Sequence, residues 1–155
     1  MGSGHEALRR GRWSEAGRIY LLTFTTANRQ PHFLAWPIAS DAARLMTGLS
    51  LWRKSRLLAW VLMPDHWHGL VELGDGMALA ECVGRLKGAS ARALRQQHPA
   101  LDRIWAPGYH DHALRREEDL LPAARYLIMN PVRAGLVSRP GDYPFWDAGW
   151  LQDSV

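Results

Sequence analysis

Two histidines separated by one apolar residue, His66-Trp67-His68, are the residues whose types and spacing most clearly suggest chemistry. In a β-strand, successive side chains point to opposite faces, so His66 and His68 would share one face and Trp67 would occupy the other. Two neutral imidazoles side by side can supply half of a metal site. Structural histidines in a sheet are the alternative interpretation, so the rest of the chain must be searched for further ligands and a nucleophile.

Two residues far downstream, Tyr126 and Asn130, could complete such a site. They are four positions apart in a helical pattern and would therefore share one helical face. A phenol can be a covalent nucleophile, and an amide oxygen can be a hard metal ligand. Because a phenol is mostly protonated at neutral pH, attack on a phosphodiester would need a divalent ion to neutralise charge at the phosphate. A packed ring and a helix-ending residue are the plainer alternative.

The length and composition restrict the number of domains, the location and the possible partners of the protein. A chain of 155 residues supports one domain with its own core, and we expect a single domain over residues 1–155. The single cysteine, Cys82, excludes an internal disulfide framework and predicts a cytoplasmic location. No apolar run is long enough to span a membrane. The formal net charge of +4, carried mainly by arginine, permits nucleic acid as a partner without demonstrating it.

Hydrophobic periodicity and turn signals predict the elements that must position these side chains. A basic N-terminal arm (1–18) precedes a strand (19–26) and a loop (28–37). A helix from Ser40-Asp41 to about Lys54 follows, and then two strands (57–63 and 66–73) joined by a turn at Pro64-Asp65. The remaining elements are a helix (78–97), a strand (109–114), a helix (117–130) capped by Asp119, and an irregular C-terminal wrap (138–155).

This order of elements predicts an α+β fold. A β-α-β-β-α-β core is the ferredoxin-like arrangement, an antiparallel sheet with helices on one face. The additional helix that bears Tyr126 follows this core.

Several stretches together resemble one family. Met63-Pro64-Asp65-His66-Trp67-His68 resembles the HUH element (histidine, hydrophobic, histidine) of the single-tyrosine transposases, the IS200-like superfamily. The stretch from Tyr126 to Val137, with its Tyr-x-x-x-Asn-Pro-x-Arg-Ala-Gly pattern, is similar to the tyrosine helix of REP-associated tyrosine transposases. Three further stretches agree with that subgroup: Leu8 to Ser14, Tyr109 to Arg115, and Asp142-Tyr143-Pro144. The resemblance covers nearly the whole chain in the expected order.

The resemblance implies a metal-dependent endonuclease and strand transferase that acts on single-stranded DNA carrying REP-type hairpins. Tyr126 would attack the scissile phosphate and form a 5′-phosphotyrosine link, while His66, His68 and Asn130 would hold Mg²⁺ or Mn²⁺. The resemblance gives no role for a second pair, His110 and His112. The residues we place along the DNA path are Arg10, Arg12, Arg18, Lys87, Arg115 and Arg133.

Two other function classes compete with this interpretation. A non-catalytic protein that binds DNA hairpins could keep the same fold. Alternatively, both histidine pairs could bind one transition metal in a cupin-like enzyme, although alternating strands and helices argue against a jelly roll. The sequence leaves open the cognate hairpin, whether full transposition occurs, and whether the protein is a monomer or a homodimer that uses Tyr126 in cis or in trans.

Overall fold

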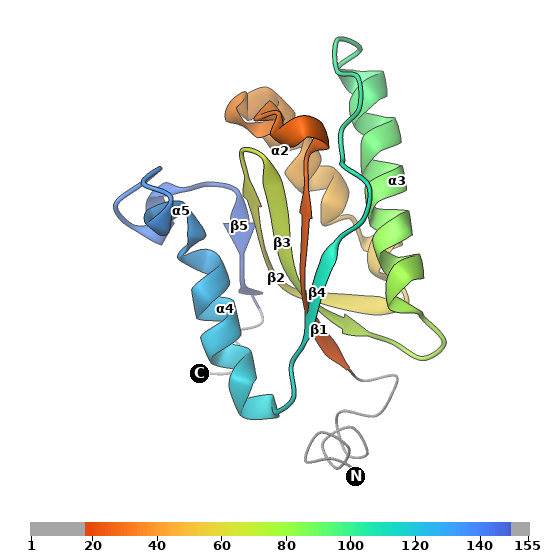
Figure 1. The fold of residues 1–155 in the computed structure, drawn as a ribbon, viewed down its shortest axis with the longest axis vertical. Coiled ribbons are helices and arrows are strands. Elements are labelled where there is room, and N and C mark those ends of the chain that lie inside the picture. Colours follow the sequence, from red (N-terminus) through yellow and green to blue (C-terminus); the bar gives the residue numbers. More distant parts are fainter. Residues whose placement is uncertain (1–17, 150–155) are drawn as a thin grey trace.

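A five-stranded antiparallel sheet with strand order β4-β1-β3-β2-β5 forms the centre of the molecule (Figure 1). The computed structural model describes residues 18–149. The strands are β1 (Ile19–Thr25), β2 (Ser55–Met63), β3 (His66–Leu73), β4 (His110–Ala113) and β5 (Trp146–Asp147). The helices are α2 (Trp36–Met46), α3 (Leu79–Gln97), α4 (Leu120–Ile128) and α5 (Asn130–Arg133). The first four strands have the order of the ferredoxin-like fold, so the predicted fold class is confirmed.

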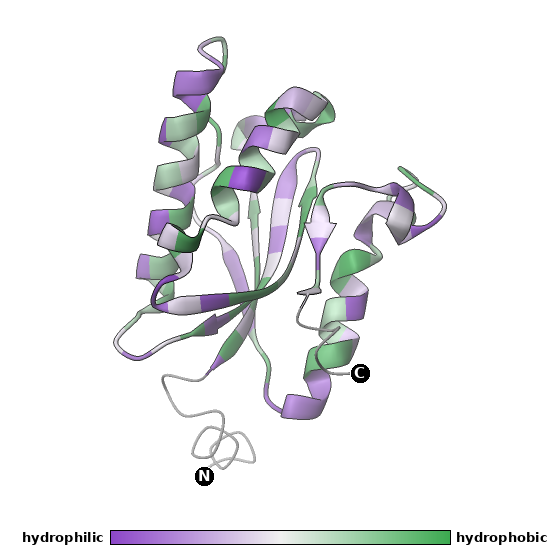
Figure 2. Cartoon of the chain, turned by 180° about the vertical axis from the view of Figure 1, so that it is seen from behind, coloured by the Kyte–Doolittle hydropathy of each residue, from purple (hydrophilic) through white to green (hydrophobic). Residues whose placement is uncertain are grey.

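The helices cover the two faces of the sheet unequally. Helices α2 and α3 lie on one face, where Trp67 stacks on Phe24 with ring centroids 5.1 Å apart. Helix α3 supports this aromatic pair by placing the Lys87 ammonium 5.6 Å from the Phe24 ring centroid. Figure 2 shows the hydrophilic residues of α3 on its outer side and its apolar residues towards α2 and the sheet. Helix α4 packs against β2 and β3 on the opposite face.

The histidine pair lies in a hairpin whose strands match the predicted ones closely. Strand β3 begins at His66, directly after the turn at Pro64-Asp65, and pairs with both β1 and β2. Trp67 is fully buried, whereas His66 and His68 point to the other face and are partly exposed. Alternation along one strand therefore anchors the hairpin through Trp67 and presents both imidazoles on the α4 side.

Gly69 is required by the packing of this anchor. A Cβ atom at this position would lie 2.0 Å from the Trp67 ring, because the indole lies across the backbone of the residue two positions along the strand. Glycine is the residue that permits such a close approach.

Two predicted helices have different bounds in the structure. Helix α2 begins at Trp36, with Pro37 in its first turn, and ends at Met46, where the sequence predicted a helix from Ser40-Asp41 to about Lys54. Proline is tolerated at this position because the first-turn N–H groups have no intrahelical acceptor. The helix predicted over 117–130 is a 3₁₀ turn at 117–119, followed by α4 and then by the separate short helix α5. Asp119 lies at the N-cap of α4 but makes no side-chain capping bond.

The segment after α5 is less irregular than predicted. Strand β5 pairs antiparallel with β2 and extends the sheet by one edge strand. The Tyr143 hydroxyl donates a 2.5 Å hydrogen bond to the carbonyl of Leu62, and the Leu62 N–H donates to the carbonyl of Phe145 at 2.9 Å. A two-residue strand carries almost no periodicity, so its pairing is decided by these tertiary contacts. Among residues 18–149, no helix combines the length and apolar character needed to cross a bilayer.

Candidate metal and nucleophile site

The two imidazoles of the His66-Trp67-His68 motif lie against each other on the α4 side of the sheet. Their ring centroids are 4.6 Å apart, and their planes are almost perpendicular. The Nδ1 atom of His66 is 2.7 Å from Oδ1 of Asp65, and the Nδ1 atom of His68 is 2.8 Å from the Thr23 hydroxyl. Each ring therefore has its Nδ1 atom engaged by a neighbouring side chain.

This arrangement prepares both rings to bind a cation through Nε2. When Nδ1–H donates to a carboxylate or hydroxyl oxygen, the lone pair resides on Nε2, which is how histidines are oriented in metal sites. Burial lowers the pKa of His68 to about 4, assisted by the nearby charges of His66 and Arg133. His68 is therefore neutral at physiological pH, as a metal-binding imidazole must be.

Tyr126 lies on α4 with its side chain largely exposed, at 59% of its full accessibility. The guanidinium carbon of Arg133 lies 3.8 Å from the centroid of its ring. The same guanidinium donates a 2.6 Å hydrogen bond to the carbonyl oxygen of Tyr126. One arginine thus holds the phenol ring by stacking and by bonding to its main chain.

The break between α4 and α5 makes this contact possible. Helix α4 ends at Ile128, and α5 begins at Asn130 with Pro131 in its first turn. The short second helix brings Arg133 back over Tyr126, seven residues earlier in the chain. The prediction of one continuous helix to Asn130 is therefore wrong, because the chain bends at Met129 and starts a new helix at Asn130.

Asn130 carries an amide whose oxygen, an acceptor, could bind a cation, whereas its nitrogen, a donor, could not. Its side-chain Nδ2 atom is buried and has no hydrogen-bond partner. A buried amide group that is left unsatisfied is costly and calls for an explanation. Among the described residues, no group of three or more His, Cys, Asp or Glu side chains could hold a metal ion. A cation here would depend on two imidazoles, an amide oxygen and ligands from outside the protein, a donor set that suits a hard, exchangeable ion.

The structure brings together some of the predicted site residues. The charge of Arg133 reaches His68, and α4 packs on the strands that carry the histidine pair, so the nucleophile candidate and the metal candidate share one side of the sheet. Two supporting residues are additional to the sequence prediction. Asp65 could have been found from its place before His66, whereas Thr23 comes from a separate strand and has no local signal.

The cationic residues predicted along the DNA path are dispersed. Lys87 lies on α3, where its ammonium donates to the carbonyls of Ala106 and Gly108, both at 2.7 Å. Arg18 precedes β1 with its guanidinium 5.4 Å from the Tyr20 ring centroid. Arg115 is exposed just beyond β4. Arg10 and Arg12 lie outside the described residues.

Three comparisons place this geometry among known proteins. The model of the family described as "Transposase IS200 like" matches residues 17–125, which include both histidines and end one residue before Tyr126. A REP-associated tyrosine transposase of Escherichia coli (strain K12) is 30% identical over 96 residues, 60% of this chain and 54% of the relative. The chain thus spans about half the length of this curated relative.

Two solved structures are similar to the structure of this chain. A REP-associated tyrosine transposase bound to a REP hairpin matches with a TM-score of 0.67 and 25% identity over 84% of this chain and 76% of that one. A putative transposase from Deinococcus radiodurans R1 has a TM-score of 0.57 and 24% identity over 70% of this chain and 86% of that one. The second likeness is one of fold.

Proposed function

We propose that this chain, which belongs to the IS200-like transposase family, nicks and rejoins single-stranded DNA at hairpins with Tyr126 as the nucleophile. The observation that carries the proposal is the exposed Tyr126 ring, held by Arg133 on the side of the sheet where His66 and His68 present their Nε2 atoms. An oriented nucleophile next to groups that can stabilise charge is the arrangement that phosphoryl transfer needs.

The reaction follows from the chemistry of a phenol and a phosphodiester. The phenolic oxygen of Tyr126 attacks the phosphorus, and the bond between phosphorus and the 3′-oxygen breaks. The phenolic proton is lost to solvent and the departing 3′-oxygen gains one, which leaves a free 3′-hydroxyl and a 5′-phosphotyrosine link. Because one phosphodiester replaces another, attack by a 3′-hydroxyl on the phosphotyrosine reverses the step without a nucleotide cofactor.

We further propose a divalent ion, Mg²⁺ or Mn²⁺, held by His66, His68 and Asn130. The ion would polarise a non-bridging phosphate oxygen and so favour attack by a phenol that is protonated at neutral pH. The chain's own contributions are the orientation of His66 by Asp65, the orientation of His68 by Thr23, and the side-chain amide oxygen of Asn130.

Hairpin DNA is the substrate class that the relatives favour. The curated relative is named for REP association, and the solved relative holds a REP hairpin. We extend that substrate to this chain as part of the proposal. A protein that binds hairpins without cutting them is the alternative, and the sequence gives it no support from a missing group, since Tyr126 and both histidines are present.

The test is formation of a covalent adduct on labelled hairpin DNA that carries single-stranded flanks, with Mn²⁺ present. The wild-type chain should give a denaturant-resistant protein–DNA species, and Tyr126→Phe should give none while it retains binding. His66→Ala should lose cleavage and keep most hairpin affinity, since phosphate contacts along the DNA dominate binding. Hairpin binding by the wild type without any adduct would favour the non-catalytic alternative.

A further inference from the structure

The second histidine pair, His110 and His112, lies on the edge strand β4 and has no part in the site described above. Both side chains are exposed, together with Asp111 between them. Alternation along the strand places both imidazoles on one face and Asp111 on the other.

The register of the sheet decides which face this is. Thr23 of β1 pairs with His68 on one side and with His110 on the other. Residues directly opposite one another in antiparallel strands share a face. His68, Thr23 and His110 therefore form one row across the sheet, and His110 is two strand spacings, about 10 Å, from His68.

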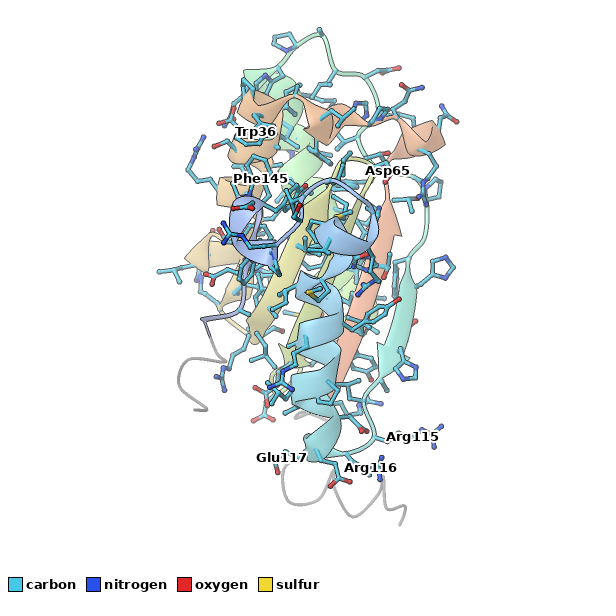
Figure 3. The ribbon with its side chains drawn as sticks, turned by 90° about the vertical axis from the view of Figure 1, so that its left-hand side faces the viewer. Trp36, Asp65, Arg115, Arg116, Glu117 and Phe145 are labelled. Atoms are coloured by element: carbon cyan, nitrogen blue, oxygen red, sulfur yellow. The ribbon has the colours of Figure 1, made fainter. Side chains whose placement is uncertain are left out.

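No described helix packs over this part of the sheet. Helix α4 packs on β2 and β3, and Figure 3 shows it running in front of the sheet while β4 lies beside it, beyond its edge. In the part of the chain that the structure describes, the stretch of this face around His110 and His112 is thus open, and Leu21 and Thr23 of β1 are partly exposed beside it. His110 lies on this face in the row that contains His68, and His112 lies on it two residues further along β4. Arg115 follows just beyond the end of the strand.

The chemistry of these side chains fits a strand of phosphates. Each imidazole offers an N–H donor, and the Arg115 guanidinium forms no ion pair with an acidic side chain of the described residues. An acidic turn over 117–119 follows Arg115, and its first residue, Glu117, is labelled near Arg115 at the bottom of Figure 3. There the neighbouring Arg116 pairs with Glu118 at 3.1 Å and with Asp119 at 3.4 Å. Carboxylates beyond Arg115 would repel phosphate, so the series of phosphate contacts ends at Arg115.

We infer that the open face of β1 and β4 binds the unpaired flank of the DNA substrate as it leaves the scissile phosphate, with His110, His112 and Arg115 contacting successive phosphates. The inference rests on the proposed function for the position of the scissile phosphate. It adds a binding subsite, and it gives a role to the histidine pair that the HUH chemistry does not use.

The test compares affinities in a Tyr126→Phe background, so that binding is measured without cleavage. Three DNA probes are used: a hairpin alone, and the same hairpin with a 5′ or a 3′ single-stranded flank. His110→Ala/His112→Ala should weaken binding of one flanked probe about ten-fold, the factor that about 1.4 kcal/mol represents, and leave the bare hairpin unchanged. His110→Glu/His112→Glu should weaken it further by repelling phosphate. Melting temperatures of both variants verify folding.

Arg115 provides a second, independent reading. For single strands, each neutralised phosphate adds about 0.7 to the slope of log affinity against log salt. Arg115→Ala should lower that slope by about 0.7 for the same flanked probe, whereas Arg92→Ala, an exposed arginine on α3 across the sheet, should leave it unchanged.

Equal affinities of the folded histidine variants and the parent for both flanked probes would overturn the inference, as would an equal loss on the bare hairpin. The proposed function has its own readout in the adduct assay. If the wild type forms the adduct but the histidine substitutions leave the affinity for both flanked probes unchanged, only the inference is refuted. If those substitutions weaken binding of a flanked probe but no adduct forms, only the nuclease proposal is refuted.

Discussion

Replacing Arg133 should slow the chemical step while the chain remains folded. Its guanidinium lies 3.8 Å from the Tyr126 ring centroid and donates to the carbonyl of the same residue. A cation–π contact at an exposed site contributes about 0.5–1 kcal/mol, and a solvent-exposed hydrogen bond from a charged donor about 1 kcal/mol more. Without them the phenol is free to occupy other rotamers.

The expected magnitude follows from those two contacts. Losing about 1.5–2 kcal/mol of restraint on the nucleophile reduces the productive population by about ten- to thirty-fold, and loss of the adjacent positive charge adds to this. Arg133→Ala should therefore form the covalent adduct about 10- to 100-fold more slowly in single-turnover assays. The free energy of unfolding should fall by no more than about 1.5–2 kcal/mol, the sum of the same two contacts, so the variant should remain folded.

Two further variants separate the causes. Arg133→Lys keeps the charge but loses the planar stack, so its rate should fall between those of wild type and Arg133→Ala. Arg139→Ala is the matched control, since Arg139 is exposed and pairs with Asp142 in its own turn at 3.1 Å. Full activity of Arg133→Lys would refute the claim that stacking on Tyr126 matters, and full activity of Arg133→Ala would refute any role in the step.

Three other outcomes are expected. Gly69→Ala should destabilise the fold by about 1–3 kcal/mol in urea unfolding, because the added Cβ would overlap the buried Trp67 ring, which must move; an unchanged midpoint would contradict this packing. Burial raises the pKa of Tyr143 to about 12 from an unfolded value near ~10. The stability that the protonated Tyr143 hydroxyl contributes to the fold is therefore complete below pH ~10 and is lost as pH rises towards 12. Tyr143→Phe should therefore cost about 1–2 kcal/mol at pH 8 and flatten the alkaline loss of stability, and an unaltered alkaline profile would count against this account. Asp65→Asn should weaken Mn²⁺ binding about 10-fold or more in calorimetry through misorientation of His66, and unchanged affinity would show that the carboxylate does not orient the ring.

The sequence by itself determined the parts of this protein that depend on local periodicity. Alternation in β3 placed the two histidines on one face and Trp67 on the other, and the hairpin bounds followed from Pro64-Asp65. The order of strands and helices was sufficient for the ferredoxin-like class, because few topologies accommodate that order. The spacing of Tyr126 and Asn130, together with the resemblance, was sufficient to predict Tyr126 as the candidate nucleophile.

Tertiary structure decided everything that depends on residues distant in sequence. The stack of Arg133 on Tyr126 requires a chain bend at Met129, and the hydrophobic periodicity of the sequence does not predict this bend. The contact of Thr23 with His68 and the alignment of His110 with both arise from strand register, which is set by pairing across the whole sheet. Lys87 is an example in which the local pattern did not predict the contacts of the side chain. It belongs to a basic helical pattern, yet its ammonium bonds to main-chain carbonyls and lies against Phe24. A local pattern fixes which face a side chain takes along its own element, but only the assembled fold fixes what that face meets.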